Sequence, residues 1–413
     1  MSTMEVHASD YDMLDPKVRA NPYPYYEALR RESPIHRIRE GMPIFAVSRF
    51  RDVEYVLHHP EQFSSTAFQA LFSGGIGLSP NSGALAGHRL LESPMMISVD
   101  PPNHMRLRGI VNRGFTPRRI AALEPRLREI AESFVGDVVE RGAMELVQDL
   151  SIPFPVTVIA ELLGIDPERR EDFKRWSDAT VIGLSGISKG FTEEDVRRNA
   201  DEMADFIDEM AAERRENPKD DLISTLVSAQ SGEEALSDGE VRSFVFLLLV
   251  AGNETTTNLI GNAVCALLRH PDQLKQVQAD SSLIPQTIEE VVRYDSPIQT
   301  LPRVATETVE LDGGVVEKGA FLMTLFASAN RDDDKFPDAA IFDIHRKPQG
   351  HMGFGHGIHF CLGASLARLE AKIALETLLS RCRDLTLRVD NVPMLDTFAL
   401  RGPQAVPIAF KAA

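Results

Sequence analysis

The most informative part of the chain is Phe354-Gly355-His356-Gly357-Ile358-His359-Phe360-Cys361-Leu362-Gly363. Its glycines permit a tight loop whose main chain can approach a ligand closely, because glycine adopts backbone angles that other residues avoid. Residues 364–382, rich in Ala, Leu, Glu and Lys, are predicted to form the helix that follows. Cys361 therefore precedes a helix N-terminus, where the positive end of the helix dipole lowers a thiol pKa and favours the thiolate.

Three interpretations of Cys361 are open on this loop alone. The first is a buried structural thiol beside a glycine-rich turn. The second is a zinc site with His356 and His359, although this spacing is tighter than structural zinc sites use and the chain has no second cysteine pair. The third is the axial thiolate of a haem iron, which needs a single cysteine and whose sulfur is tuned by nearby main-chain amides. The ten-residue pattern favours the haem thiolate.

The overall charge argues against polyanionic partners. The 413 residues include 44 Lys+Arg and 61 Asp+Glu, a formal net charge of −17. This balance disfavours a generic nucleic-acid binder and an anionic membrane surface as partners. Cys265, Cys361 and Cys382 are too few and too widely spaced for a disulfide framework, so we expect a reducing compartment.

The chain shows no membrane or secretion signal. Its N-terminus lacks the charged start and apolar core of a signal peptide. The longest purely apolar run, 244–251, is far shorter than the ~20 residues needed to span a bilayer. A hydrophobic share of 43% is ample for a buried core, and no linker divides the sequence. We expect one domain over residues 1–413 in a soluble, cytoplasmic protein.

The hydrophobic periodicity predicts a mainly α protein with minor, mostly antiparallel β sheets. The clearest predicted helices are 117–140, 200–214 and 364–382. The predicted strands are 44–47, a hairpin over 308–316 that turns at Asp312-Gly313, 321–325 and 385–389. Two glycine-rich stretches, 63–94 and 183–190, are predicted loops, and the apolar residues of the first favour a loop that covers an apolar ligand over a surface excursion.

A long central helix is predicted from Ser237, where a capping box with Glu240 begins it, to residue 270, because Pro271 ends it. Within it, Ala251-Gly252-Asn253-Glu254-Thr255-Thr256-Thr257 places a carboxylate and three threonines in an otherwise apolar run. One interpretation is that Glu254 faces solvent and the threonines bond back to the preceding turn. The other is that Glu254 and Thr255 form a proton-handling pair that faces a cavity.

With these segments in view, the chain resembles the cytochrome P450 superfamily in its soluble bacterial form. The family's haem loop, F-G-x-G-x-H-x-C-x-G, is matched at every defined position from Phe354 to Gly363. Its A-G-x-E-T pattern is matched at 251–255, and its E-x-x-R pair by Glu290 and Arg293. The resemblance covers almost the whole chain from Asn21 onward. It implies the cytochrome P450 fold, a helical prism around a buried haem.

The resemblance also implies which residues hold haem b. Cys361 is the expected ligand of the iron. The pair His104 and Arg108, in an H-x-x-x-R pattern after Asp100-Pro101-Pro102, is expected to contact the haem propionates together with Arg303 and His359. Because the haem carries two carboxylates and the protein is acidic overall, positively charged side chains are needed locally to bind them. The full set of expected cofactor-binding residues is His104, Arg108, Ala251, Gly252, Arg303, His359, Cys361 and Gly363.

One departure from the family pattern concerns the Glu290–Arg293 pair. In relatives this pair is structural, and a loop that reads roughly P-D-x-D-R-F-D adds a further arginine. Here the loop reads P-D-A-A-I-F-D over 337–343, so Ile341 stands where the arginine is expected. The third partner is open at this point, and Arg346 is one candidate.

The resemblance implies a monooxygenase that inserts one atom of O2 into an apolar small molecule, such as a terpenoid, steroid, fatty acid or polyketide. Glu254 and Thr255 are the expected catalytic residues: Glu254 relays protons through water and Thr255 hydrogen-bonds the dioxygen. Gly252 is expected to let the helix open beside the iron. The alternatives are a peroxide-driven hydroxylase and a haem-binding sensor without catalysis, and the intact acid–alcohol pair disfavours both. The expected walls of the substrate site are 63–94, 173–191 and Ile298–Leu301.

Electrons are expected from NAD(P)H through a ferredoxin reductase and a ferredoxin. Two segments predicted on the thiolate side of the haem are locally basic in spite of the overall charge. Their cations are Arg106, Arg108, Arg113, Arg118 and Arg119 in one, and Arg346, Lys347 and Arg368 in the other. Such a basic proximal face would attract an acidic ferredoxin-type donor. The protein is expected to act as a monomer.

Overall fold

The computed structural model describes residues 5–39, 41–72, 85, 87–185, 192–228 and 235–413. Its chain divides into two compact units. The first, here the sheet unit, comprises Met1–Ser64, Leu127–Ile152 and Thr255–Ala413, and the second, here the helical unit, comprises Ser65–Arg126 and Pro153–Glu254. Two borders fall inside continuous helices, α6 (Pro117–Val139) and α11 (Asp238–Arg269). We therefore keep a single domain over residues 1–413 as a proposal.

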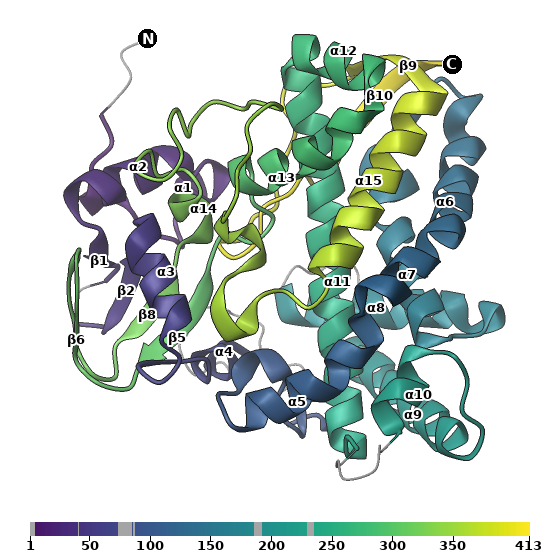
Figure 1. Ribbon diagram of the computed structural model, residues 1–413, viewed down its shortest axis with the longest axis horizontal. Helices are drawn as coiled ribbons and strands as arrows, with labels where there is room; N and C mark the ends of the chain where they lie inside the picture. Colours follow the sequence, from purple (N-terminus) through teal and green to yellow (C-terminus); the bar gives the residue numbers. More distant parts are fainter. Residues whose placement is uncertain (1–4, 40, 73–84, 86, 186–191, 229–234) are drawn as a thin grey trace. The chain divides into compact units, whose positions relative to one another are not determined.

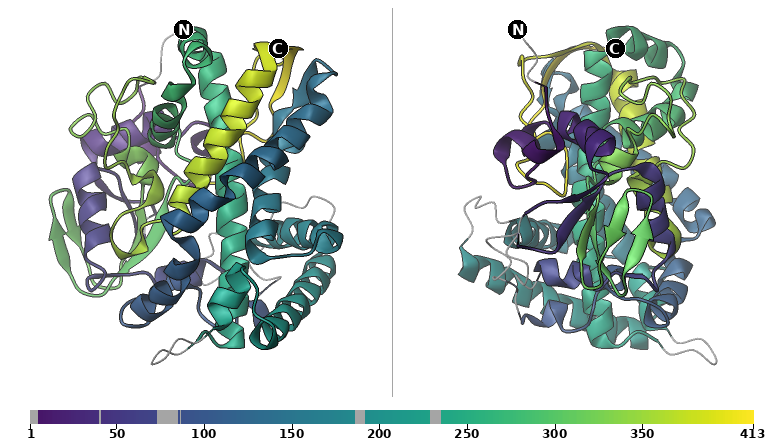
Figure 2. Two further views of the ribbon diagram at one scale, coloured as in Figure 1. Left: turned by 45° about the vertical axis from the view of Figure 1, so that its right-hand side comes forward. Right: turned by 90° about the vertical axis from the view of Figure 1, so that its left-hand side faces the viewer.

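The sheet unit is built on a five-stranded sheet with the order β1-β2-β8-β5-β3. These strands are β1 (Ile35–Arg37), β2 (Ile44–Val47), β3 (Phe63–Ser64), β5 (Leu301–Ala305) and β8 (Phe321–Thr324). Strands β2 and β8 run parallel, with Ile44 opposite Phe321, and the other pairs are antiparallel. Figure 2 shows these purple N-terminal and green later strands lying side by side in its right-hand view.

Helix α3 (Phe50–His58) lies beside this sheet in Figure 1, and a hydrophobic core fills the space between the two. The helix contributes Phe50, Val53 and Val56 to that core, and the strands contribute Phe45 and Leu322. Met352, a few residues before the cysteine loop, belongs to the same buried cluster, as do residues of α14 (Phe326–Ala329). The core therefore fixes the start of the cysteine loop against the sheet.

The rest of the sheet unit is helical with two smaller sheets. Its other helices are α1 (Pro16–Ala20), α2 (Tyr23–Glu32), α12 (Pro271–Ala279), α13 (Ile284–Tyr294) and α15 (Ala364–Arg381). The smaller sheets are the antiparallel β4-β10-β9, with bounds Ala143–Glu145, Pro407–Ala412 and Cys382–Leu387, and the hairpin of β6 (Val309–Leu311) and β7 (Gly314–Val316). Helices α13 and α15 pack together, which brings the E-x-x-R helix beside the helix that follows Cys361.

The helical unit holds α4 (Ala67–Phe72), α5 (Asn103–Val111), α7 (Pro153–Leu163), α8 (Arg170–Ser185), α9 (Glu193–Glu216) and α10 (Leu222–Val227). Helices α8 and α9 pack along each other. The buried Trp176 of α8 donates its indole N–H to Glu202 of α9 at 3.0 Å, and its ring lies 5.1 Å from that of Phe206. The two helices are therefore joined by an aromatic contact in which the buried indole N–H is hydrogen-bonded.

Most of the predicted elements are present, with shifted ends. Helices α6, α11 and α15 and strand β2 lie within one or two residues of their predicted bounds, whereas α9 begins seven residues before residue 200. The hairpin also forms where it was predicted. The strand pairs are mostly antiparallel, as predicted, and the exception is the parallel pair β2–β8. Of the predicted loop segments, 73–84, 86 and 186–191 lie outside the described residues.

The central helix α11 begins as its sequence predicts. The main-chain N–H of Ser237 donates to Glu240 Oε2 at 2.9 Å, and the Glu240 N–H donates to Ser237 Oγ at 3.3 Å, which completes the capping box. Within the described residues, α11 is also the one helix with the length and composition to cross a membrane, and 67% of its apolar window is buried inside the protein. Core helices of globular proteins share these properties, so α11 is weak evidence for a membrane span.

Candidate active site

The cysteine loop belongs to the sheet unit and is closed by its own main chain. The N–H of Cys361 donates to the carbonyl oxygen of Phe354 at 2.8 Å. Gly355 and Gly357 both have φ of +68°, which favours glycine. A Cβ on Gly357 would also collide with the main-chain oxygen of Leu57, at the end of α3. The glycines of the motif are therefore required by the turn and by its contact with α3.

Cys361 differs from the other two cysteines in its surroundings. Cys265 and Cys382 are buried, and burial raises their thiol pKa values to about 12 and about 11. Cys361 is partly exposed and stands just before Gly363, the N-cap residue of α15. It is thus the cysteine that a ligand can reach, beside the positive end of an 18-residue helix. This donor fits the thiolate ligand that a haem iron requires.

Arg303 and His359 lie in the same unit as Cys361. Arg303 is in β5, opposite Leu322 of β8, and only 4% of it is exposed. Its Nη1 donates to the carbonyl of Pro302 at 2.7 Å. His359 is half-buried and ends the 3-10 turn Gly357–His359 that precedes the cysteine. A buried guanidinium and a nearby imidazole suit the two carboxylates of a haem.

The predicted pair His104 and Arg108 lies on one face of α5, in the helical unit, because residues four apart are neighbours on a helix. His104 is buried, and Arg108 is half-buried with its Nε donating to Asn112 Oδ1 at 3.1 Å. Burial, and then the positive charge of Arg108, lowers the pKa of His104 below its usual range. His104 is therefore a neutral hydrogen-bond donor near pH 7, whereas we expected two cations here.

The polar segment of α11 does not break the helix. Helical geometry continues through Ala251–Thr257, so the expected opening at Gly252 is not seen. A Cβ on Gly252 would lie 3.0 Å from Cδ1 of Ile159, so this glycine permits the close packing of α11 on α7. Ala251 is exposed, and Glu254 and Thr255 are half-buried.

Two neighbouring polar residues of α11 bind other elements. In the helical unit, Asn253 Nδ2 donates to Ser177 Oγ of α8 at 3.2 Å. In the sheet unit, Thr257 Oγ1 donates to the carbonyl of Ser151 at 2.8 Å. Glu254 is half-buried, and the role of Glu254 and Thr255 in proton handling stays a prediction.

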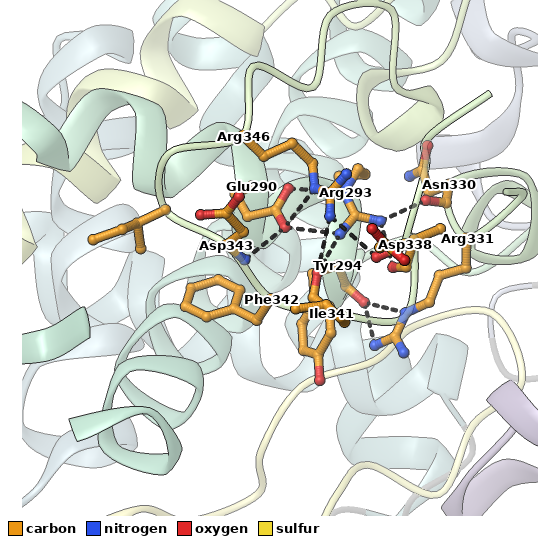
Figure 3. Close-up of polar contacts among 12 residues, drawn as sticks. Glu290, Arg293, Tyr294, Asn330, Arg331, Asp338, Ile341, Phe342, Asp343 and Arg346 are labelled. Carbon is orange, nitrogen blue, oxygen red and sulfur yellow. Dashed lines mark hydrogen bonds and ion pairs between the residues drawn. The ribbon is translucent and has the colours of Figure 1, made fainter. Parts of the chain in front are cut away.

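The Glu290–Arg293 pair is fully buried in the sheet unit, and Figure 3 shows its surroundings. Arg293 donates from Nε to Glu290 Oε2 at 2.8 Å and from Nη2 to Oε1 at 2.7 Å. Its Nη1 donates to the carbonyls of Asn330 and Ala339 at 2.9 and 2.7 Å. Both charges are thereby hydrogen-bonded, which an ion pair without solvent requires.

Arg346 is the third partner of this pair, which confirms the candidate proposed from the sequence. Its Nε donates to Glu290 Oε1 at 3.2 Å, and its other nitrogens donate to the carbonyls of Pro337 and Asp338 at 2.6 and 3.1 Å (Figure 3). Ile341 is 58% exposed, and its main-chain carbonyl accepts a hydrogen bond from Arg293 Nη2 at 3.2 Å. Arg346, five residues further along the chain, therefore takes the place of the arginine expected at the position of Ile341.

The cations predicted for a basic face are partly neutralised. In the helical unit, Arg106 pairs with Glu240, and Arg119 pairs with Asp220 at 2.8 Å. In the sheet unit, Arg368 donates to both oxygens of Glu289, at 2.5 and 2.9 Å. Because these arginines are paired, each unit presents a smaller basic surface than its sequence suggests. Arg118 and Lys347 are exposed and contribute to it.

The sequence analysis missed the role of Glu289. Besides Arg368, it receives Nε2 of His351 at 3.0 Å, and these partners, against the opposing effect of burial, hold the pKa of its carboxyl down to about 2. The signal was present in the paired acids at 289 and 290, of which the family motif uses only the second. Glu289 ties α13 to α15 and to His351, three residues before the cysteine loop.

The predicted substrate walls are only partly described. Ile298 and Leu301 are partly buried and pack against the core of the sheet unit. Residues 73–84, 86 and 186–191 of the other two walls lie outside the described residues.

Comparisons with known proteins identify the family that this chain is similar to. A family model described as Cytochrome P450 matches residues 189–407. The structure of cytochrome P450 CYP109Q5 from Chondromyces apiculatus is 42% identical, covers 98% of each chain and has a TM-score of 0.87.

Two further relatives are named for what they act on or bind. The vitamin D(3) 25-hydroxylase of Pseudonocardia autotrophica is 36% identical over 415 residues, 99% of this chain and 98% of that protein. The structure of CYP109E1 from Bacillus megaterium in complex with corticosterone is 33% identical, covers 95% of this chain and 99% of that one, and has a TM-score of 0.83. These likenesses confirm the predicted mainly α fold with small sheets. The chain therefore belongs to the cytochrome P450 family, and with it to the monooxygenases that bind haem b.

Proposed function

We propose that the protein inserts one atom of O2 into an apolar small molecule, with Cys361 as the thiolate ligand of its haem iron. The observation that carries this assignment is the environment of Cys361: a partly exposed thiol in a glycine-closed loop at the start of α15. When bound, a haem with an axial thiolate supplies the activation of dioxygen. The residues of this chain bind the cofactor, hold the substrate and move protons.

Four polar residues are proposed to bind the haem propionates. Arg303 and His359 of the sheet unit, and His104 and Arg108 of the helical unit, bind the propionates through charge-assisted and neutral hydrogen bonds. The small residues Ala251 and Gly363 leave room for the macrocycle, and Gly252 joins the set by letting α11 pack closely on Ile159 of α7. The support for this set is its chemistry: buried or half-buried donors in an acidic protein, matched to a ligand with two carboxylates.

Glu254 and Thr255 deliver protons to the reaction. They are consecutive in α11, so their side chains point about 100° apart and a proton passes between them through water. A half-buried carboxylate can exchange protons with solvent, and a hydroxyl can accept one hydrogen bond while donating another. This division of roles explains why an acid and an alcohol occur together in an apolar helix.

The substrate is apolar, and steroid-like molecules are the first class to test. Ile298 and Leu301 offer apolar surface that is only partly buried, and pockets for such ligands are mostly apolar. Two relatives are named for a vitamin D hydroxylation and for a bound corticosterone. Substrate binding is measured by titrating the haem absorption band with a library that begins with steroids.

The electron donor is an acidic ferredoxin, and the protein works as a cytoplasmic monomer. Exposed Arg118 of the helical unit and Lys347 of the sheet unit supply positive charge, and Phe360, next to Cys361, is 42% exposed. Charge attraction raises the association rate of such partners and is screened by salt. Arg118→Glu should slow reduction by ferredoxin several-fold at low salt, whereas Arg388→Glu, at an exposed position in the sheet unit, should leave it unchanged. Equal rates for both variants would remove Arg118 from the donor surface.

The activity is tested by consumption of NAD(P)H in the presence of a ferredoxin reductase and ferredoxin. Consumption should depend on the substrate and yield hydroxylated product in the wild type. Thr255→Ala should keep its haem but convert most of the consumed NAD(P)H into hydrogen peroxide, whereas Thr256→Ser should stay coupled. Product formation with peroxide alone, and none with the ferredoxin system, would favour the peroxide-driven hydroxylase. The absence of turnover across the library would favour the sensor.

A further inference from the structure

Three metal-binding side chains meet where α3 ends beside the cysteine loop. Glu54 and His58 are four residues apart on α3 and therefore lie on the same face of that helix. His356 comes from the loop. One ligand atom from each of the three lies within 4.8 Å of the other two, and all three residues belong to the sheet unit.

The spacing is close to what one metal ion requires. Zinc binds histidine nitrogen and carboxylate oxygen at about 2.0–2.2 Å, so two ligands of a tetrahedral site lie about 3.4 Å apart. Nδ1 of His356 and Oε1 of Glu54 are already 3.7 Å apart. The His58 and His356 rings have centroids 5.8 Å apart and planes inclined by 74°. His58 is an exposed side chain at the end of α3, and a movement of its ligand atom by up to about 1.4 Å would close the site.

His356 is held in place by its surroundings. Its ring meets that of Phe50 edge-on at 6.3 Å. The neighbouring Gly357 fits tightly against the main chain of Leu57, which fixes the loop to the same turn of α3 that carries His58.

The type of donor and the exposure indicate which ion would bind. Two imidazoles and a carboxylate suit zinc and related divalent transition metals, whereas calcium and magnesium prefer oxygen ligands alone. His58 is exposed, and Glu54 and His356 are partly exposed, so an ion can enter from solvent and keep a water molecule as fourth ligand. None of the three residues belongs to the set proposed to bind haem.

We propose that Glu54, His58 and His356 bind one Zn²⁺ ion, which links the end of α3 to the cysteine loop. The bound ion joins two segments that are about 300 residues apart in sequence and restrains the loop that carries Cys361. The site is independent of the role proposed for Cys361 and of the substrate.

The proposal is tested by calorimetric titration of the haem-loaded protein with zinc chloride. The wild type should bind one equivalent. His58→Ala and Glu54→Gln should each weaken binding at least tenfold, while haem content and circular dichroism stay unchanged. His59→Ala is the matched control, because His59 is adjacent in sequence but its ring is stacked on Tyr55 at 3.8 Å and its Nδ1 lies 2.7 Å from the Tyr55 carbonyl. This variant should bind zinc within twofold of the wild type.

Absorption spectroscopy at the zinc edge identifies the ligands. The zinc-loaded wild type should show two imidazole nitrogens and oxygen ligands, without sulfur. The proposal is overturned if the wild type binds no zinc, if His58→Ala and Glu54→Gln both bind it as tightly as the wild type, or if the spectrum shows sulfur bound to zinc. Should His58→Ala lose its haem, Glu54→Gln carries the test, because it exchanges a charged oxygen ligand for a neutral amide of the same size.

Discussion

Replacing Arg346 by alanine tests whether this residue performs the role that relatives give to an arginine at the position of Ile341. The change removes the 3.2 Å bond to Glu290 and the bonds to the carbonyls of Pro337 and Asp338. Glu290 keeps both bonds from Arg293, so its buried charge stays paired. The loss should therefore be smaller than the loss from Arg293→Ala, which removes both of the shorter bonds to Glu290 and leaves its buried charge with the 3.2 Å bond from Arg346 as its ion pair.

The expected magnitude follows from these bonds. A hydrogen bond to a charged group contributes about 1.5–3 kcal/mol and a neutral one about 1 kcal/mol. The Arg346 side chain is 15% exposed, so water replaces part of what the carbonyls lose. We expect a loss of about 2–3 kcal/mol for Arg346→Ala, against about 3–5 kcal/mol for Arg293→Ala. At ~2.1 cal/mol/K per residue, the 413 residues give an unfolding entropy of about 0.9 kcal/mol/K, so Arg346→Ala should lower Tm by about 3 °C.

The assay is scanning calorimetry of the haem-loaded protein at one scan rate. Lys347→Ala, at the exposed neighbouring position, is the control and should shift Tm by less than about 1 °C. Adding Ile341→Arg to Arg346→Ala restores a guanidinium at the position that relatives use and should recover part of the lost stability. The reasoning is refuted if Arg346→Ala behaves like Lys347→Ala, or if Ile341→Arg lowers the stability of the double variant further.

Two further predictions concern packing and pH. Gly252→Leu should destabilise the protein by about 1–3 kcal/mol, because a side chain there overlaps Ile159, and thermal unfolding measures this loss; Gly109→Ala in α5, where a Cβ meets open space, should instead be neutral or slightly stabilising. Arg368→Met should lower stability towards urea above pH 4.5. The difference in stability from the wild type should shrink as pH falls from 4.5 towards 2. The reason is that the pKa of Glu289 is held at about 2, so protonation in this range removes its ion pair with Arg368. A difference that stays constant across this range would show that Glu289 is not the partner that matters.

The features that were predicted correctly are those encoded by neighbouring residues. The cysteine loop is recognisable because its turns need glycine at 355 and 357, where φ is positive. The start of α11 is recognisable because Ser237 and Glu240 satisfy each other's main-chain groups. Such local requirements leave a mark within a few residues of sequence.

The features that were missed depend on residues far apart in the chain. Nothing near Ile44 indicates that β2 pairs in parallel with β8 at Phe321. The replacement of the loop arginine by Arg346 was named only as one candidate, because it depends on how residues 337–346 fold around Glu290. Pairings of this kind are set by packing of the whole unit and not by local propensity.

Charge was the property that sequence described least well. His104 was expected to be a cation, but burial and Arg108 lower its pKa. Arg106, Arg119 and Arg368 were expected to form a basic face, but each is paired with an acidic residue. The sequence counts charges, whereas burial and pairing decide which of them reach solvent or a ligand.

The absorption spectrum of the reduced, CO-treated protein tests the assignment of Cys361 most directly. The wild type and Cys382→Ala should both show the red-shifted Soret band that thiolate ligation produces, because Cys382 is buried in β9. Cys361→Ala should lose that band. A red-shifted band that persists in Cys361→Ala, or its absence from the wild type, would contradict the proposal that Cys361 holds the iron.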